Sequence, residues 1–164
     1  MFMKCTDYEN VNDTFCQILK KRRDKSVVKG RIDIEHIALA KKAEFIYNII
    51  SSFSTKSEYI YRILFWEKDQ VLKVFFKQYF SEIEYTIYQS YQNKQKPGIC
   101  FVSGDELSKS FFKLLITNHF NYELAKNPSL NIRIQIFFRI KGFNIVFDIY
   151  DDRGFYLVWI SLNS

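Results

Sequence analysis

The sequence from Asn131 to Leu162 reads NIRIQIFFRIKGFNIVFDIYDDRGFYLVWISL and contains three apolar runs separated by short polar segments. The runs cover residues 131–140, 143–150 and 155–162, and each is rich in branched and aromatic side chains, which is typical of β-strands. Asp151-Asp152-Arg153-Gly154, between the last two runs, consists largely of turn-forming residues. We therefore predict three consecutive strands with a charged turn, which fits either a recognition edge or a plain hairpin.

The upstream sequence alternates between helical and extended patterns. Apolar residues recur at intervals of three to four in four segments, which predicts helices. These begin at a cap on Thr6 or Asp7, at Ile34, at Gln70 and at Ser103-Gly104-Asp105, and the second should end near Ser51-Ser52. Three further segments have the pattern of strands. They are a buried strand over residues 59–66, a strand with one solvent-exposed face over residues 82–89, and a short strand over residues 99–102.

This arrangement predicts an α+β fold formed by one domain over residues 1–164. Runs of helices and strands that do not alternate strictly favour a mainly antiparallel sheet, with helices packed largely on one face. A length of 164 residues and an apolar content of 48% are enough for one hydrophobic core.

Several classes of protein do not fit the composition. No apolar stretch approaches the roughly 20 residues that span a bilayer, and no secretory segment follows the first residues, so we expect a cytoplasmic protein without a membrane partner. Cys5, Cys16 and Cys100 have no Cys-x-x-Cys spacing, which predicts reduced thiols instead of a disulfide framework or a zinc site.

The net charge of +6 favours acidic partners or nucleic acid. One dense basic run, KKRRDK from Lys20 to Lys25, falls where the first helix should end. Cations at that position complement the negative end of the helix dipole, so the run is either a solvated helix end or a contact for nucleic acid.

Candidate catalytic residues are few. His36 and His119 are the two histidines, and neither lies in a motif. With a lysine they could serve as the base and acid of a metal-free ribonuclease, provided that the fold brings them together. The chain has five glycines and no glycine-rich phosphate loop. We predict no catalytic residue and no cofactor.

The carboxylates near the turn offer a second kind of site. Asp148, Asp151 and Asp152 could supply oxygen ligands to Mg²⁺ or Ca²⁺, although their spacing does not match an EF-hand loop. A turn in which an aspartate pairs with Arg153 is the favoured interpretation, and we predict no metal site.

Residues 136–159, with the segment FDIYDDRG at 147–154, resemble the closing strand–turn–strand of a bacterial family of unknown-function domains. Members of that family occur as immunity proteins beside polymorphic toxins of contact-dependent growth inhibition. The resemblance implies a protein that binds and neutralises a cognate toxin C-terminal domain, with a nuclease as one candidate. No catalytic residues come with the family.

A toxin inhibitor needs a rigid surface with aromatic and charged anchors. Acidic side chains could face a basic toxin, while tyrosines offer a large contact area. The predicted contacts are Asp148, Asp151, Asp152, Arg153 and Tyr156 near the turn, and Glu82, Glu84, Tyr85 and Tyr88 on the strand with one solvent-exposed face. The alternative function is a basic nucleic-acid-binding or nuclease protein that uses Lys20 to Lys25 for phosphates and aromatic residues for bases.

Overall fold

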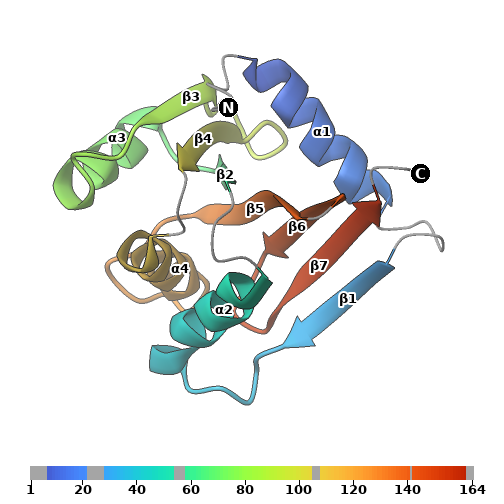
Figure 1. Ribbon diagram of the computed structural model, residues 1–164. Coiled ribbons are helices and arrows are strands. Elements are labelled where there is room, and N and C mark those ends of the chain that lie inside the picture. Colours follow the sequence, from blue (N-terminus) through green and yellow to red (C-terminus); the bar gives the residue numbers. More distant parts are fainter. Residues whose placement is uncertain (1–6, 22–27, 54–57, 105–107, 141, 162–164) are drawn as a thin grey trace.

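The computed structural model describes residues 7–21, 28–53, 58–104, 108–140 and 142–161 (Figure 1). Its seven-stranded sheet has the order β1-β7-β6-β5-β2-β4-β3, and all neighbouring strands are antiparallel. The strands are β1 (Val28–Asp33), β2 (Tyr59–Phe65), β3 (Tyr85–Gln89), β4 (Gly98–Gly104), β5 (Ile132–Ile140), β6 (Phe143–Ile149) and β7 (Gly154–Ser161). The helices are α1 (Tyr8–Lys21), α2 (Leu39–Phe53), α3 (Asp69–Tyr79) and α4 (Lys109–Glu123).

The three C-terminal strands form the meander that their sequence predicts. β5 and β6 pair from Ile134 opposite Ile149 to Ile140 opposite Phe143, and β7 then pairs with β6. Because side chains alternate between the two faces of a strand, Ile134, Ile136 and Phe138 all enter the same apolar core. Strand β2 lies between β5 and β4, and side chains on both of its faces are buried, in agreement with a sequence that is apolar except for Arg62.

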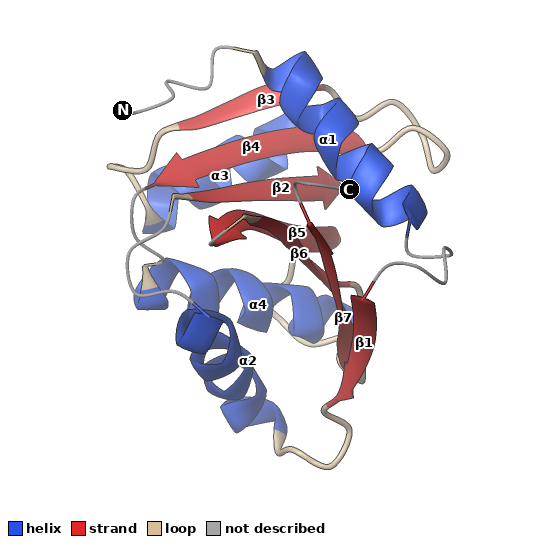
Figure 2. Ribbon diagram, turned by 45° about the vertical axis from the view of Figure 1, so that its right-hand side comes forward, coloured by secondary structure: helices blue, strands red, loops and turns tan. Residues whose placement is uncertain are grey.

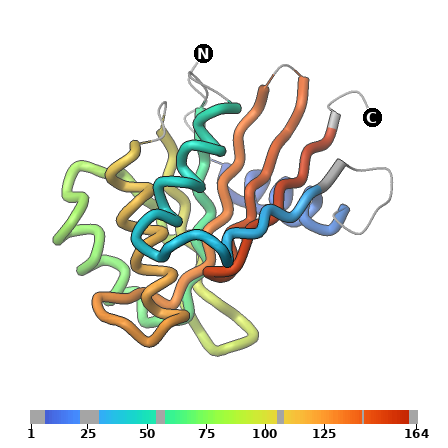
Figure 3. The backbone as a smooth tube through the Cα atoms, turned by 90° about the horizontal axis from the view of Figure 1, so that it is seen from below, coloured from blue at the N-terminus to red at the C-terminus, as the bar shows by residue number. Residues whose placement is uncertain are grey.

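Helices cover both faces of the sheet, but unequally (Figures 2 and 3). Helices α2, α3 and α4 pack on one face, where they form the larger core with side chains of β2, β5, β6 and β7. Of the four described helices, only α1 packs on the opposite face, which we call the α1 face. Its Phe15 and Ile18 pack against a smaller cluster that includes Phe101, Val146 and Val158. The α+β prediction with helices largely on one face is confirmed.

The sequence did not predict β1. This strand lies between the first two expected helices, and the second of them, expected from Ile34, begins only at Leu39 as α2. The sequence VKGRID has little apolar bulk, and as an edge strand β1 pairs only with β7, so backbone hydrogen bonding places it there without a strong side-chain pattern.

The beginning of α4 also differs from the prediction. Ser103 and Gly104 continue β4 opposite Ile60 and Tyr59, and the helix begins at Lys109, where the Ser108 hydroxyl accepts a hydrogen bond from the Phe111 backbone N–H. Asp105, the expected cap, lies outside the described residues. The other predicted helices and strands are present with shifted ends, and no helix in the described part of the chain is long and apolar enough to span a membrane.

Candidate interaction surfaces

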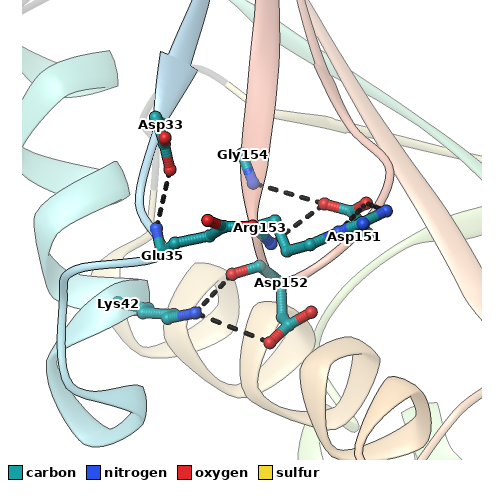
Figure 4. A network of polar contacts seen from close by, with 7 residues as sticks. All are labelled: Asp33, Glu35, Lys42, Asp151, Asp152, Arg153 and Gly154. Carbon is teal, nitrogen blue, oxygen red and sulfur yellow. Dashed lines mark hydrogen bonds and ion pairs between the residues drawn. The ribbon is translucent and has the colours of Figure 1, made fainter.

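The turn between β6 and β7 is held by Asp151 (Figure 4). Its Oδ1 accepts hydrogen bonds from the backbone N–H groups of Arg153 at 2.9 Å and Gly154 at 3.2 Å. Its Oδ2 accepts two more from the Arg153 guanidinium, at 3.0 and 2.7 Å. Burial raises the pKa of Asp151, but the hydrogen bonds from Arg153 outweigh burial and lower the pKa overall. The expected structural turn with an aspartate–arginine pair is confirmed.

Two other contacts fasten this turn to its neighbours, and Figure 4 shows the first of them. The buried Lys42 of α2 donates a hydrogen bond to the Asp152 carbonyl and lies 3.5 Å from the Asp152 carboxylate. The backbone N–H of Ile34 donates to the Arg153 carbonyl at 2.8 Å. Both carboxylates of the turn are therefore engaged by the fold, and the larger part of the Arg153 side chain remains exposed.

Asp148 lies inside a polar row that crosses the sheet on the α1 face. The strand register places Arg62, Gln135, Asp148, Tyr156 and Arg31 directly opposite one another on successive strands. Residues directly opposite on neighbouring strands share a face, so these side chains meet beneath and beside α1. The sequence signal for the row is a lone polar residue within each apolar run, as in YIYRILF and IRIQIFF.

The carboxylate of Asp148 is fully buried and accepts hydrogen bonds from Arg133 at 2.8 and 2.6 Å. Gln135 donates to it at 3.3 Å and accepts a hydrogen bond from Arg62 at 2.7 Å. The prediction that Asp148 contacts a partner is therefore not supported, because its carboxylate is held inside the sheet. Sequence reasoning missed Arg62, Gln135 and Arg133, which surround it.

Helix α1 closes one end of the polar row. The Arg62 guanidinium donates to Asn12 Oδ1 at 2.8 Å and lies 3.7 Å from Cys16 Sγ. Burial, as the largest cause, lowers the pKa of Arg62. These contacts explain how a nearly buried arginine is tolerated between the helix and the sheet.

The other end of the row carries two tyrosines and two arginines, which we call the tyrosine–arginine platform (Tyr150, Tyr156, Arg31 and Arg133). The rings of Tyr150 and Tyr156 stack with centroids 5.2 Å apart, and the Arg133 guanidinium lies 5.9 Å from the Tyr150 ring. Arg31 faces Tyr156 across the β1–β7 pair, and its guanidinium passes over Gly154. Burial raises the pKa of Tyr150, and the nearby charge of Arg31 opposes this rise.

The remaining predicted contacts lie at the opposite edge of the sheet. Glu82 and Glu84 are exposed in the connection between α3 and β3, and no ion pair joins either to another described residue. Tyr85 is half-buried and stacks on Phe76 of α3 with a centroid separation of 4.3 Å. Tyr88, on the other face of β3, is exposed and contacts the Phe101 ring by its edge.

Helix α3 runs alongside β3 at this edge (Figure 1). Its first turn is tied to the end of β3, because the Tyr91 backbone N–H donates to Asp69 Oδ1 at 3.2 Å. Leu72, Phe75 and Phe76 face the core. Val71 and Val74 lie on the outer side of α3 and are 44% and 49% exposed. Tyr79 at the end of the helix is also exposed.

We call this region the α3–β3 surface, defined by Val71, Val74, Tyr79, Glu82, Glu84 and Tyr88. The sheet order places β3 at one edge and β7, next to β1, at the other. The predicted contact residues therefore fall into two groups on opposite sides of the molecule, and no compact partner surface contains all of them.

The two histidines lie in different surroundings and do not form a pair that could act as base and acid. His36 is exposed in the connection between β1 and α2, whereas His119 is buried in α4. Neither ring nitrogen of His119 has a hydrogen-bond partner among the described residues. Burial is the main reason that its pKa falls to about 4, despite the nearby carboxylate of Asp151 and the backbone of Tyr150.

The other predicted features are placed as follows. Lys20 and Lys21 are exposed in the last turn of α1, while residues 22–25 of the basic run lie outside the described part of the chain, as does Cys5. Burial raises the pKa of the Cys100 thiol to about 12. No group of three or more His, Cys, Asp or Glu side chains that could hold a metal ion occurs among the described residues.

Comparisons of the chain with protein-family models, with curated proteins and with solved structures found no match.

Proposed function

We propose that this chain is an immunity protein that binds a cognate bacterial toxin domain and neutralises it by protein–protein contact at the α3–β3 surface. The observation that carries the proposal is the exposure of apolar side chains on α3 and of two carboxylates, without ion-pair partners among the described residues, in the connection that follows the helix. Apolar area with a polar rim is the composition of a protein-binding patch.

The rigidity of this surface supports the proposal. Helix α3 is anchored by Leu72, Phe75 and Phe76 in the core, and Tyr85 of β3 stacks on Phe76. A partner that docks on Val71 and Val74 meets side chains already fixed by the fold, so little conformational entropy is lost on binding. The exposed Tyr79 and Tyr88 add side chains of a type that is enriched among the residues that dominate binding energy.

The distribution of acidic side chains narrows the chemistry of the partner. Asp148, Asp151 and Asp152 are engaged within the fold, so they are not available as the acidic anchors expected from the sequence. Glu82 and Glu84 remain as exposed carboxylates beside apolar groups. The part of the toxin surface that meets Glu82 and Glu84 should therefore be basic, although α3 itself exposes Lys73 and Lys77 and the chain as a whole carries a charge of +6.

The test uses the protein domain encoded directly upstream of this chain, which the proposal predicts to be the toxin. Cells that express the toxin domain should grow when they also express the wild-type chain. The Val74→Asp variant should lose this protection, because it places a charge at the centre of the apolar contact. Asp13→Lys, a change at an exposed residue of α1 outside the α3–β3 surface, is the matched control and should protect like the wild type.

Calorimetry with the purified toxin domain measures the same contact directly. Charge reversal at both Glu82 and Glu84 should weaken binding by more than about 1 kcal/mol if they are anchors. Affinity that stays unchanged in the folded Val74→Asp and Glu82→Lys/Glu84→Lys variants would remove the α3–β3 surface from the interface. A chain that binds no such toxin but binds nucleic acid would favour the alternative function.

A further inference from the structure

We infer that the outer edge of β1 pairs with the same edge of a second copy of this chain, antiparallel and around a two-fold axis, so that the two copies form one continuous sheet. This inference goes beyond toxin neutralisation and does not depend on it. It rests on an open strand edge and on the order of the charges along that edge.

The edge of β1 is open. Among the described strands β1 pairs only with β7, and no described helix or strand lies beyond it (Figures 1 and 2). The strand at the other end of the sheet differs, because a register shift between Ile87 and Gln89 interrupts the pairing of β3 with β4. Irregularities of this kind protect an edge against the addition of another strand. The register of β1 is uninterrupted, so β1 lacks this protection.

The register also shows which backbone groups of β1 point outward. The Ile34 backbone N–H donates to the Arg153 carbonyl, in continuation of the register between β1 and β7. Because successive residues of a strand direct their N–H and C=O groups to alternate sides, Ile34 and Ile32 direct theirs toward β7. Arg31 and Asp33 therefore direct theirs away from the sheet, and both residues are exposed. An added strand would pair with these backbone groups.

The two outward-facing residues carry opposite charges. Arg31 forms no ion pair with another described residue. Asp33 uses Oδ1 to accept a hydrogen bond from the Glu35 backbone N–H, which leaves its Oδ2 without a partner in the described part of the chain (Figure 4). In an antiparallel pair centred on Ile32, Arg31 of each copy lies opposite Asp33 of the other, so this pair of charges occurs twice. Opposite charges directly across two strands stabilise their pairing.

The charges select one register and favour a second copy as the occupant. A pair centred on Arg31 would set two guanidinium groups opposite each other, and a pair centred on Asp33 would set two carboxylates opposite each other. Like charges in these positions destabilise strand pairing. Of the three registers, only the one centred on Ile32 matches each charge with its opposite. The edge is therefore complementary to itself, which is the condition for a two-fold dimer.

The other face of the strand fits the same register. Ile32 is half-buried against the larger core, and at the two-fold axis the Ile32 side chains of both copies face each other. Gly30 lies opposite Ile34 of the other copy and adds no side chain there. The α3–β3 surface lies at the far edge of the sheet, so each copy in the dimer keeps its own.

Sedimentation velocity of the full chain tests dimerisation. The mass should rise with concentration from the 19.7 kDa of one chain toward twice this value. The range is about 1 μM to about 1 mM, because a short strand contact gives a small and weak interface. Arg31→Asp sets carboxylates opposite each other in both pairs and should raise the Kd of the dimer at least about fivefold. Lys73→Asp reverses an exposed cation on α3 and is the matched control, which should leave the Kd unchanged.

An exchange of charges makes the test specific for the register. Asp33→Arg alone should also weaken the dimer, because it sets a second cation opposite Arg31 of the other copy. A mixture of Arg31→Asp with Asp33→Arg should associate again, since every facing pair then has opposite charges. Circular dichroism of each variant before mixing verifies that it is folded.

The inference is overturned if the wild type keeps the mass of one chain over the whole range. It is also overturned if Arg31→Asp and Lys73→Asp weaken the dimer equally, or if the mixed variants do not associate. A monomeric wild type whose Arg31→Asp variant loses binding to the toxin domain would assign the edge to a strand of the toxin. Val74→Asp, which tests the α3–β3 surface, should dimerise like the wild type, so the two proposals fail separately.

Discussion

Asp151 closes the β6–β7 turn with four hydrogen bonds to its carboxylate, two of them from backbone N–H groups. The side chain thereby replaces the partners that the backbone of a tight turn lacks. Gly154 at the end of the turn also has a steric role, because a Cβ at this position would lie 2.8 Å from the Ile32 carbonyl oxygen. At the residue scale, the charged corner is a structural device that joins β6, β7 and the segment after β1.

Removing the Asp151 carboxylate should therefore reduce stability. Asp151→Ala leaves the N–H groups of Arg153 and Gly154 without their partner, so we expect the free energy of unfolding to fall by about 1 to 3 kcal/mol. Urea denaturation measures the loss. Asp152→Ala is the matched control: it keeps the carbonyl to which Lys42 donates, so its loss should be smaller. Equal stability of the wild type and Asp151→Ala would refute the role assigned to the turn.

His119 makes stability depend on pH. Its pKa is about 4 in the folded chain, below the ordinary value of 6.5, because burial disfavours the charged imidazolium. Between these two values the unfolded chain binds the proton more readily, so the free energy of unfolding should fall as the pH drops from 6.5 and level off below about 4. A pKa difference of this size corresponds to roughly 3 kcal/mol in the free energy of unfolding.

Urea denaturation between pH 4 and 7.5 tests this dependence on His119. His119→Leu should flatten the pH profile, whereas substitution of the exposed His36 by Gln should leave it unchanged. A slope that survives in His119→Leu would assign the pH dependence to other groups.

At the scale of elements, pairing between strands determines the structure of segments that the side-chain pattern alone does not assign. The runs that became β2, β5, β6 and β7 were recognisable because each is buried, and burial demands apolar bulk. β1 was not recognisable, since its place is set by backbone pairing with β7. The beginning of α2 was missed for a related reason. Ile34 and Ile37 extend the apolar spacing of the helix backwards, but Ile34 is held by the Arg153 carbonyl and not by a helical turn.

Gly98 shows how closely β2 and β4 are fitted together. It lies opposite Phe65, and a Cβ at Gly98 would come within 2.1 Å of the Phe65 ring, which is buried. We expect Gly98→Ala to lower the free energy of unfolding by about 1 to 3 kcal/mol, the usual cost of overpacking. Gly30→Ala on the edge strand β1 is the matched control, because its Cβ would meet no atom within 4 Å. Similar losses in both variants would contradict this packing.

At the scale of the whole molecule, the two surfaces differ in chemistry and lie at opposite edges of one sheet. The α3–β3 surface combines apolar groups with exposed carboxylates, while the platform beside β1 combines tyrosines with arginines. Sequence reasoning identified Glu82, Glu84, Tyr88 and Tyr156 as candidates but could not separate them, because their distance in space depends on the strand order. It also assigned Asp148 to the contact with a partner, since the arginine that binds its carboxylate comes from a different strand.

The proposed function predicts how the inhibitor acts as well as where it binds. A protein that only covers its target is consumed in the complex, so each molecule can neutralise one toxin domain. An enzyme that modified the toxin would instead inactivate many molecules in turn.

The most direct measurement is a titration of toxin activity with the purified chain at concentrations well above the Kd. We expect residual activity to fall linearly and to reach zero when chain and toxin are equimolar, with the Val74→Asp variant shifted to higher concentrations. Complete inactivation by a small fraction of an equivalent, or undiminished activity at excess chain, would contradict neutralisation by surface binding.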